Sequence, residues 1–164
     1  MNWVIVIMAF VTLQRLGELI LAKRNTAQLL ASGGYEIGGT HYPIIVAFHT
    51  AWILGIWWLA PTQAVNWYLI AVFVVLQALR VWVIATLGSR WTTRIICVPG
   101  ETLVARGPFR FLNHPNYAVV IGEIFILPLA FGLIWFSIVS GLINIAILAW
   151  RIRVENAALA PVRH

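Results

Sequence analysis

The chain contains little charge and no aspartate. Of its 164 residues, 62% are hydrophobic and 10% are charged, and glutamate supplies all five acidic side chains. A soluble domain carries about 25% charged residues, so this composition and the mean hydropathy of +0.90 exclude an ordinary soluble domain. We therefore predict an integral membrane protein. Because little sequence remains outside the apolar runs, residues 1–164 are interpreted as a single polytopic domain.

Cysteine and metal-ligating patterns are also scarce. Cys97 is the one cysteine, which excludes an internal disulfide, and no Cys/His spacing resembles a zinc site. The net charge of +6 would suggest nucleic acid in a soluble protein, but here the Lys and Arg residues cluster between apolar runs, as membrane topology requires. The sequence therefore predicts neither a bound metal nor a nucleic-acid partner.

Long apolar runs dominate what is present. A membrane-spanning helix needs about 20 mainly apolar residues, and residues 2–22, 42–60 and 66–87 supply three such runs. Residues 116–150 have the length of two shorter or tilted spans, with a break near residues 131–135. We predict an all-α membrane protein of about five transmembrane helices, in which the last two form a helical hairpin.

The basic residues predict the orientation of these spans. Five crossings place every basic connection on one side, because residues 61–67 and the turn near 133 contain neither Lys nor Arg. By the positive-inside rule, the N-terminus lies outside and the C-terminus is cytoplasmic. The basic side carries Lys23, Arg24, Arg90, Arg94, Arg106, Arg110, Arg151, Arg153 and Arg163.

Four charged residues fall within the predicted spans. Arg15 and Glu18 are three residues apart and share a helical face, either as a structural ion pair or as one wall of a site. Arg80 lies about two turns from the end of its span, where it can snorkel or enter a cavity. An intramembrane carboxylate such as Glu123 must be protonated, paired or lining a cavity, and it is a candidate for function.

The connection over residues 25–43 contains two Gly-Gly pairs, which mark turns and flexible backbone. It can be interpreted as a gate over a site. Pro43 suits the first turn of the second helix and follows His41 and Tyr42. His49 lies one to two turns further along, and it is interpreted equally as a hydrogen-bonded core residue or as a functional one.

The longest polar stretch, residues 88–113, leads into a helix start. Either Asn113 or His114 can cap the helix that Pro115 begins. The imidazole and the free backbone N–H groups would then lie at an electropositive helix end, which suits a carboxylate.

Near the C-terminus, Arg151 and Glu155 lie at i and i+4 on one face of the last helix. A surface salt bridge is the ordinary explanation of such a pair. The predicted hairpin, however, brings this pair to the same membrane face as residues 100–117, so the two polar segments are interpreted as walls of one site.

With these residues in hand, the sequence resembles the isoprenylcysteine carboxyl methyltransferase family. That family carries a Gly-Pro-Tyr/Phe segment, an Arg-His-Pro-x-Tyr segment and a terminal Arg-Ile-x-x-Glu-Glu segment, which correspond here to residues 107–109, 113–117 and 151–156. The resemblance covers about the C-terminal 65 residues. Asn113 replaces the Arg before His-Pro, and Asn156 replaces the second Glu. The N-terminal half resembles a bacterial branch linked to O-methylation of lipidic phenols or pyrones.

The resemblance implies transfer of a methyl group from S-adenosylmethionine to a carboxylate, phenol or enol oxygen of a lipophilic acceptor. It implies a bacterial inner-membrane enzyme whose active site faces the cytoplasm, with the cofactor-binding part at about residues 88–164. The catalytic candidates are Arg151, which would orient the acceptor oxygen, and Glu155 and Glu123, either of which could act as base. The residues expected at the cofactor are Arg106, Gly107, Pro108, Phe109, Asn113, His114, Pro115, Tyr117 and Glu155.

Three alternatives remain at this point. A sterol-type reductase that uses NADPH shares a His-Pro-x-Tyr-like segment, although this chain is short and lacks a dinucleotide fingerprint. A phospholipid N-methyltransferase differs only in its acceptor. A non-catalytic lipid-binding or transport protein would use Arg15, Glu18 and Glu123 as a path, but the inverted repeats typical of transporters are not evident.

Overall fold

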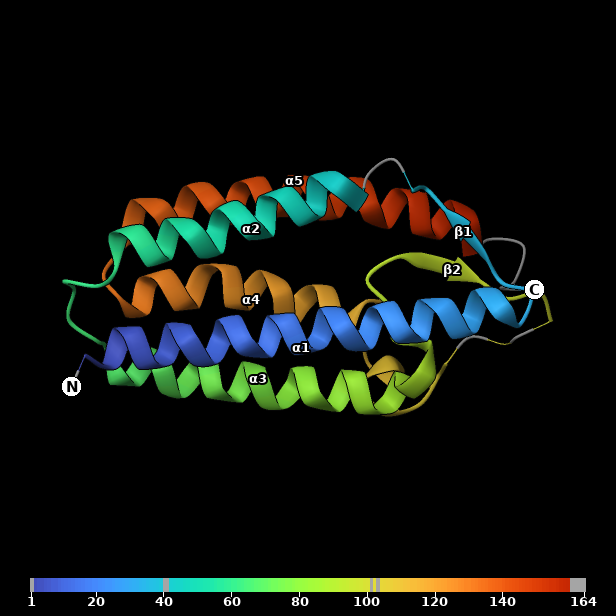
Figure 1. Cartoon of the computed structure of the whole chain (residues 1–164), viewed down its shortest axis with the longest axis horizontal. Helices are drawn as coiled ribbons and strands as arrows, with labels where there is room; N and C mark the ends of the chain where they lie inside the picture. Colours follow the sequence, from blue (N-terminus) through green and yellow to red (C-terminus); the bar gives the residue numbers. More distant parts are fainter. Residues whose placement is uncertain (1, 40–41, 101, 103, 160–164) are drawn as a thin grey trace.

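The computed structural model is a bundle of five α-helices with one small sheet (Figure 1). It describes residues 2–39, 42–100, 102 and 104–159, so His41 lies outside the described residues. The elements in chain order are α1 (Trp3–Ala31), β1 (Tyr35–Ile37), α2 (Tyr42–Leu59), α3 (Trp67–Leu87), η1 (Gly88–Arg90), β2 (Ile95–Cys97), η2 (Gly107–Arg110), α4 (Pro115–Ala130) and α5 (Ile134–Leu159).

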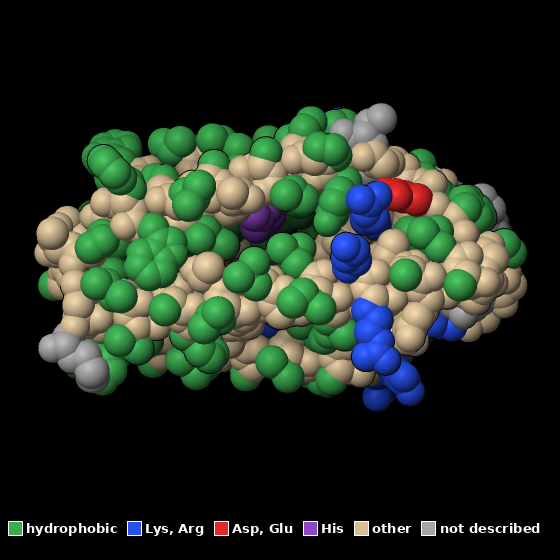
Figure 2. All heavy atoms as spheres, in the orientation of Figure 1, with side chains coloured by type: hydrophobic (Ala, Val, Ile, Leu, Met, Phe, Trp, Pro, Cys, Tyr) green, Lys and Arg blue, Asp and Glu red, His purple; other side chains and the backbone are tan. Residues whose placement is uncertain are grey.

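The helices are long and apolar, as an integral membrane protein requires. In the described part of the chain, α1, α2, α3 and α5 are each long and apolar enough to cross a membrane, whereas α4 has only 16 residues. The helical framework of the prediction is therefore confirmed. The span count of five and the sidedness remain predictions. Figure 2 shows that the visible Lys and Arg side chains gather in one half of the bundle, the arrangement that the charge pattern predicts.

The predicted break before the last helix is present. Helix α4 ends at Ala130 and α5 begins at Ile134. Gly132 takes the positive φ of 73° that this short turn requires, and the Leu133 N–H donates to the Pro128 carbonyl over 3.0 Å. Helices α4 and α5 consequently run antiparallel, and α4 packs against both α3 and α5.

The apolar core lies toward the end of the bundle that holds the α4–α5 turn. Apolar side chains that are at most 9% exposed come together there from all five helices. They include Met8, Ile56, Phe73, Leu127 and Leu148. This packing fixes the helices relative to one another and leaves the opposite end for polar groups.

The segment between the first two spans differs from its predicted form. Helix α1 runs to Ala31, about nine residues beyond the predicted span, so the helix projects past its apolar part. The Gly-Gly segment then forms β1, which pairs antiparallel with β2, with Tyr35 opposite Cys97 and Ile37 opposite Ile95. The all-α prediction missed this sheet because three-residue strands carry too few residues to show a period.

Candidate active site between helices α4 and α5

A cavity of about 570 Å³ lies at the polar end of the bundle. Its walls come from the end of α1, from η1 and β2, from the segment before α4, from the start of α4 and from the end of α5. The residues that line it are Leu29, Leu87, Arg90, Trp91, Thr92, Arg94, Ile95, Ile96, Cys97, Val98, Thr102, Val104, Ala105, Phe109, Asn113, His114, Pro115, Asn116, Tyr117, Arg151 and Glu155.

Tyr117 joins the two helices in the wall of this cavity. Its hydroxyl accepts a hydrogen bond from Nε of Arg151 over 2.8 Å and donates one to Oε2 of Glu155 over 2.5 Å. The i, i+4 pair of α5 therefore meets on a tyrosine of α4. A phenol that links a cation to a carboxylate holds both charges in place by charge-assisted hydrogen bonds.

His114 completes this cluster at the start of α4. Its ring stacks on Tyr117 with a centroid separation of 5.2 Å, and its Nδ1 lies 3.7 Å from Oε2 of Glu155. His114 is the N-cap residue of α4, but its side chain makes no capping hydrogen bond. The imidazole faces the cluster instead, so the predicted side-chain cap of α4 is not formed. The His114 carbonyl accepts the first hydrogen bonds of the helix, from the N–H groups of Tyr117 and Ala118.

The loop between α3 and β2 is tied to the same cluster. Arg151 Nη2 donates to the Thr93 carbonyl over 2.8 Å, and the Thr93 hydroxyl lies 3.1 Å from the hydroxyl of Tyr42. Arg94 stands over the Tyr42 ring at 4.4 Å and pairs with Glu36 of β1 at 2.7 Å. The Gly-Gly segment thus contacts the site through side chains of β1 and the start of α2.

The predicted cofactor residues divide into two groups. Those that line the cavity are Phe109, Asn113, His114, Pro115, Tyr117 and Glu155. Arg106, Gly107 and Pro108 lie beside it, where they begin the short helix η2. Gly107 has a φ of 58°, and a Cβ there would lie 2.7 Å from Oγ1 of Thr86. We interpret this segment as the support that holds Phe109 in the wall.

The structure separates Glu123 from the other catalytic candidates. Arg151 and Glu155 line the cavity, whereas Glu123 is 2% exposed and lies in an ion cluster among α1, α3 and α4. Its carboxylate pairs with Arg15 and Arg80, each at 2.9 Å, and accepts from Gln77 over 2.7 Å. Glu18 pairs with the same two arginines. The structural interpretation of the Arg15–Glu18 pair is therefore the one that fits.

Several cavity residues were not predicted from the sequence. Arg90, Trp91, Arg94 and Cys97 enter through the loop after α3, and Asn116 through α4. The Oδ1 of Asn116 is buried and has no hydrogen-bond partner among the described residues. Burial raises the pKa of the Cys97 thiol, and the negative charge of Glu155 raises it further. Asn116 lies within the motif segment 113–117 and could have been predicted from it, whereas no neighbouring residue in the sequence indicates a role for Cys97.

Comparison with known proteins places the chain in a family. The structure is a bundle of apolar helices with a polar cavity, and motif residues at the start of α4 and the end of α5 line part of it. Residues 69–161 match the isoprenylcysteine carboxyl methyltransferase (ICMT) family, and the chain belongs to that family of membrane methyltransferases.

One relative extends the similarity over the whole chain. It is the "Uncharacterized protein YpbQ" of Bacillus subtilis (strain 168), which is 35% identical over 164 residues, covering 97% of this chain and 96% of the relative. No solved structure matches the chain. The family match spans nearly all of α3 and the whole of η1, β2, η2, α4 and α5, and these elements build most of the cavity.

Proposed function

We propose that this protein transfers a methyl group from S-adenosylmethionine to an oxygen of a lipophilic acceptor, at the cytoplasmic face of a bacterial inner membrane. The observation that supports this most is the convergence of Tyr117, Arg151, Glu155 and His114 on one cavity wall. These residues belong to the segments that the ICMT family match covers.

The residues of the cavity fit the proposed cofactor. A volume of about 570 Å³ falls within the 300–1,000 Å³ range of small-molecule sites. The start of α4 and His114 would hold the methionine carboxylate. Glu155 would meet an amino or hydroxyl group, and the unpartnered Oδ1 of Asn116 would accept a hydrogen bond from a ligand N–H. When bound, S-adenosylmethionine supplies an electrophilic methyl group on a positively charged sulfur.

The protein's own groups would orient the acceptor. Arg151 is 7% exposed and fixed by Tyr117 and the Thr93 carbonyl, so its guanidinium can hold an anionic oxygen in one position. Alignment of the two reactants alone supplies several kcal/mol. A carboxylate acceptor arrives ionised and needs no base. For a phenol or enol, Glu155 takes the proton, since it lines the cavity and Glu123 is occupied by the ion cluster.

The first experiment is a ligand-dependent unfolding measurement on the purified protein in detergent. S-adenosylhomocysteine at 100 times its dissociation constant is expected to raise the free energy of unfolding by about 2.7 kcal/mol. NADPH, the cofactor of the reductase alternative, is expected to have no effect. A response to NADPH alone would instead support the reductase. Methyl transfer to a panel of lipidic phenols, enols and carboxylates then identifies the acceptor.

Arg151→Ala tests the acceptor role. We expect turnover to fall by about 100-fold or more, because the acceptor oxygen loses its positioning charge, while stabilisation by S-adenosylhomocysteine changes little. Arg151→Lys is the control that keeps the charge and loses the planar fork. If Arg151→Ala abolishes the response to S-adenosylhomocysteine as well, Arg151 belongs to the cofactor and not to the acceptor.

A further inference from the structure

The bundle contains a second set of polar groups, deeper than the cavity and near the ion cluster, whose charges act on His49. His49 of α2 donates from Nδ1 to the Ile45 carbonyl over 2.9 Å, which leaves the lone pair of Nε2 free. Trp52 is 3% exposed, and its indole N–H has no partner among the described residues. Asn144 of α5 is fully buried, and neither atom of its amide has such a partner.

These groups lie at similar depths in the bundle. Gly55 of α2 packs against the ring of Phe136 of α5, and the two helices run in opposite directions (Figure 1). From this contact, His49 and Asn144 lie six and eight residues toward the same end, which is about 9 and 12 Å at the α-helical rise. Trp52 follows His49 by three residues and shares its helical face.

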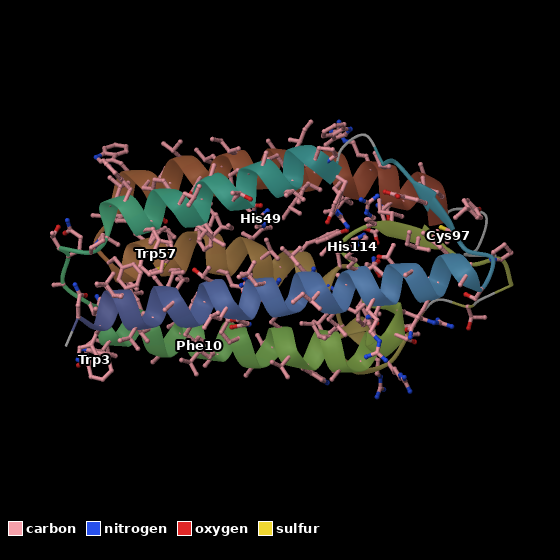
Figure 3. All side chains as sticks on the ribbon, in the orientation of Figure 1. Trp3, Phe10, His49, Trp57, Cys97 and His114 are labelled. Atoms are coloured by element: carbon pink, nitrogen blue, oxygen red, sulfur yellow. The ribbon has the colours of Figure 1, made fainter. Side chains whose placement is uncertain are left out.

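The surface beside His49 is hollowed. In Figure 2, a histidine side chain is visible at the bottom of a hollow with hydrophobic side chains around its rim, at the position where Figure 3 labels His49. This hollow lies beside α2, which is long and apolar enough to cross a membrane, and its rim is hydrophobic. Its occupant therefore comes from the bilayer, where bulk water is absent.

One face of α2 runs from the hollow toward the end of the bundle that holds the cavity. Tyr42, which contacts Thr93 at the site, and His49 are at i and i+7 on that face, about 10 Å apart along the axis. A lipid whose reactive oxygen lies near Arg151 would extend its apolar body past Tyr42 toward His49.

We propose that His49, Trp52 and Asn144 form a subsite for a hydroxyl group carried on the apolar body of the methyl acceptor. A hydroxyl both donates and accepts. It can donate to Nε2 of His49 while accepting from the Trp52 indole or the Asn144 amide. A purely hydrocarbon chain would leave these groups unsatisfied, which is costly when they are buried. The identification of this ligand as the methyl acceptor rests on the proposed function.

The test compares three radiolabelled probes on the full-length protein in detergent: 10-hydroxystearic acid, 2-hydroxystearic acid and stearic acid. The mid-chain hydroxyl should tighten binding about three- to tenfold, as one net hydrogen bond in a buried site does, whereas the hydroxyl beside the carboxylate should not. If the unsubstituted protein binds all three probes with equal affinity, the proposal is overturned. That result is expected if only ordered water fills the subsite.

Variants assign the preference to residues. Trp52→Phe, Asn144→Leu and His49→Phe should each reduce or remove the preference for 10-hydroxystearic acid and leave the affinity for stearic acid within about twofold. Trp58→Phe is the matched control on the same helix, because the Trp58 side chain is 86% exposed. A preference unchanged in all three variants would overturn the assignment.

The test of the hydroxyl subsite can be distinguished from the test of the proposed function. Stabilisation by S-adenosylhomocysteine is measured on the same samples, and it should not change in the three variants. If the hydroxyl preference is present but S-adenosylhomocysteine does not bind, the subsite stands as a lipid-binding site and the methyltransferase proposal fails.

Discussion

At the residue scale, the hydroxyl of Tyr117 is the contact on which the site's charges depend. It is bonded to both Arg151 and Glu155, so removing one oxygen atom takes one hydrogen bond from each of two charged groups. For Tyr117→Phe we expect a loss of about 1–3 kcal/mol in the free energy of unfolding and weaker stabilisation by S-adenosylhomocysteine. Both are measured by denaturant titration in detergent.

Tyr68→Phe is the control for Tyr117→Phe. Tyr68 is 88% exposed at the start of α3, so losing its hydroxyl should change the free energy of unfolding by less than about 0.5 kcal/mol. If the two variants behave alike, the Tyr117 hydroxyl contributes no more than an ordinary surface group, and the proposed cluster is wrong.

Cys97 provides a reporter of the cavity that needs no substitution. Only the thiolate is alkylated, and burial and Glu155 raise the pKa of Cys97 above its ordinary value. The rate of labelling with N-ethylmaleimide should therefore rise with pH through a midpoint above the value of about 8.5 for a free thiol. S-adenosylhomocysteine should slow labelling, because Cys97 lines the cavity.

Glu155→Gln tests whether the charge of Glu155 raises the pKa of Cys97. Removing the negative charge should lower the midpoint of the labelling profile, since that charge is one of the two causes that raise the pKa. A midpoint at or below about 8.5 in the unmodified protein would contradict the environment described for Cys97. The readout is specific because the chain has one cysteine.

At the scale of elements, η2 depends on a backbone that only glycine adopts easily. Gly107 and Gly100 both have positive φ, 58° and 81°, but a Cβ at Gly107 would meet Thr86, whereas one at Gly100 would meet nothing within 4 Å. Gly100→Ala should therefore cost only the strain of the backbone, about 1 kcal/mol. Gly107→Ala should cost about 1–3 kcal/mol more in the free energy of unfolding because of the added crowding.

A second substitution separates these two causes. Thr86→Ala combined with Gly107→Ala should recover most of the additional cost and leave a loss close to that of Gly100→Ala. Stability is followed by thermal unfolding in detergent. If Gly107→Ala and Gly100→Ala cost the same, the close approach of Thr86 to η2 is not what fixes this segment.

The sequence predicted helices better than the segments that join them. Apolar runs found all three early helices and the break before Ile134, because a membrane span is specified by length and hydropathy alone. The extension of α1 to Ala31 was missed because Lys23 and Arg24 end the apolar run without breaking the helix. Strands β1 and β2 pair across about 60 residues, and no local period reports such a contact.

At the scale of the whole molecule, the candidate site was predictable where motifs carry it. The motif residues His114, Tyr117, Arg151 and Glu155 do line one cavity, although their catalytic roles remain proposals. The wall from the loop after α3 was not predictable, because it reaches the site through tertiary contacts such as that between Arg151 and the Thr93 carbonyl. Glu123 is the opposite case. A carboxylate within a predicted span suggested a catalytic role, and only the packing of three helices shows that it pairs with two arginines.

The ion cluster that holds Glu123 gives the last prediction. Arg15 and Arg80 balance Glu18 and Glu123, so the formal charge of the cluster is zero. Glu123→Gln leaves one positive charge uncompensated in an apolar bundle. Breaking a buried ion pair in this way costs about 3–5 kcal/mol, which should appear as a large loss of stability in detergent. The matched control is Glu36→Gln, whose partially exposed pair with Arg94 should cost less than about 1 kcal/mol.

Restoring the balance of charge distinguishes an electrostatic cause from a steric one. Arg15→Gln combined with Glu123→Gln returns the cluster to zero charge and should be more stable than the sum of the two single losses predicts, by about 1–3 kcal/mol. Turnover and stabilisation by S-adenosylhomocysteine should persist in this double variant, because neither residue lines the cavity. If the double variant folds but cannot transfer a methyl group, Glu123 takes part in the reaction, and the base is not Glu155 alone.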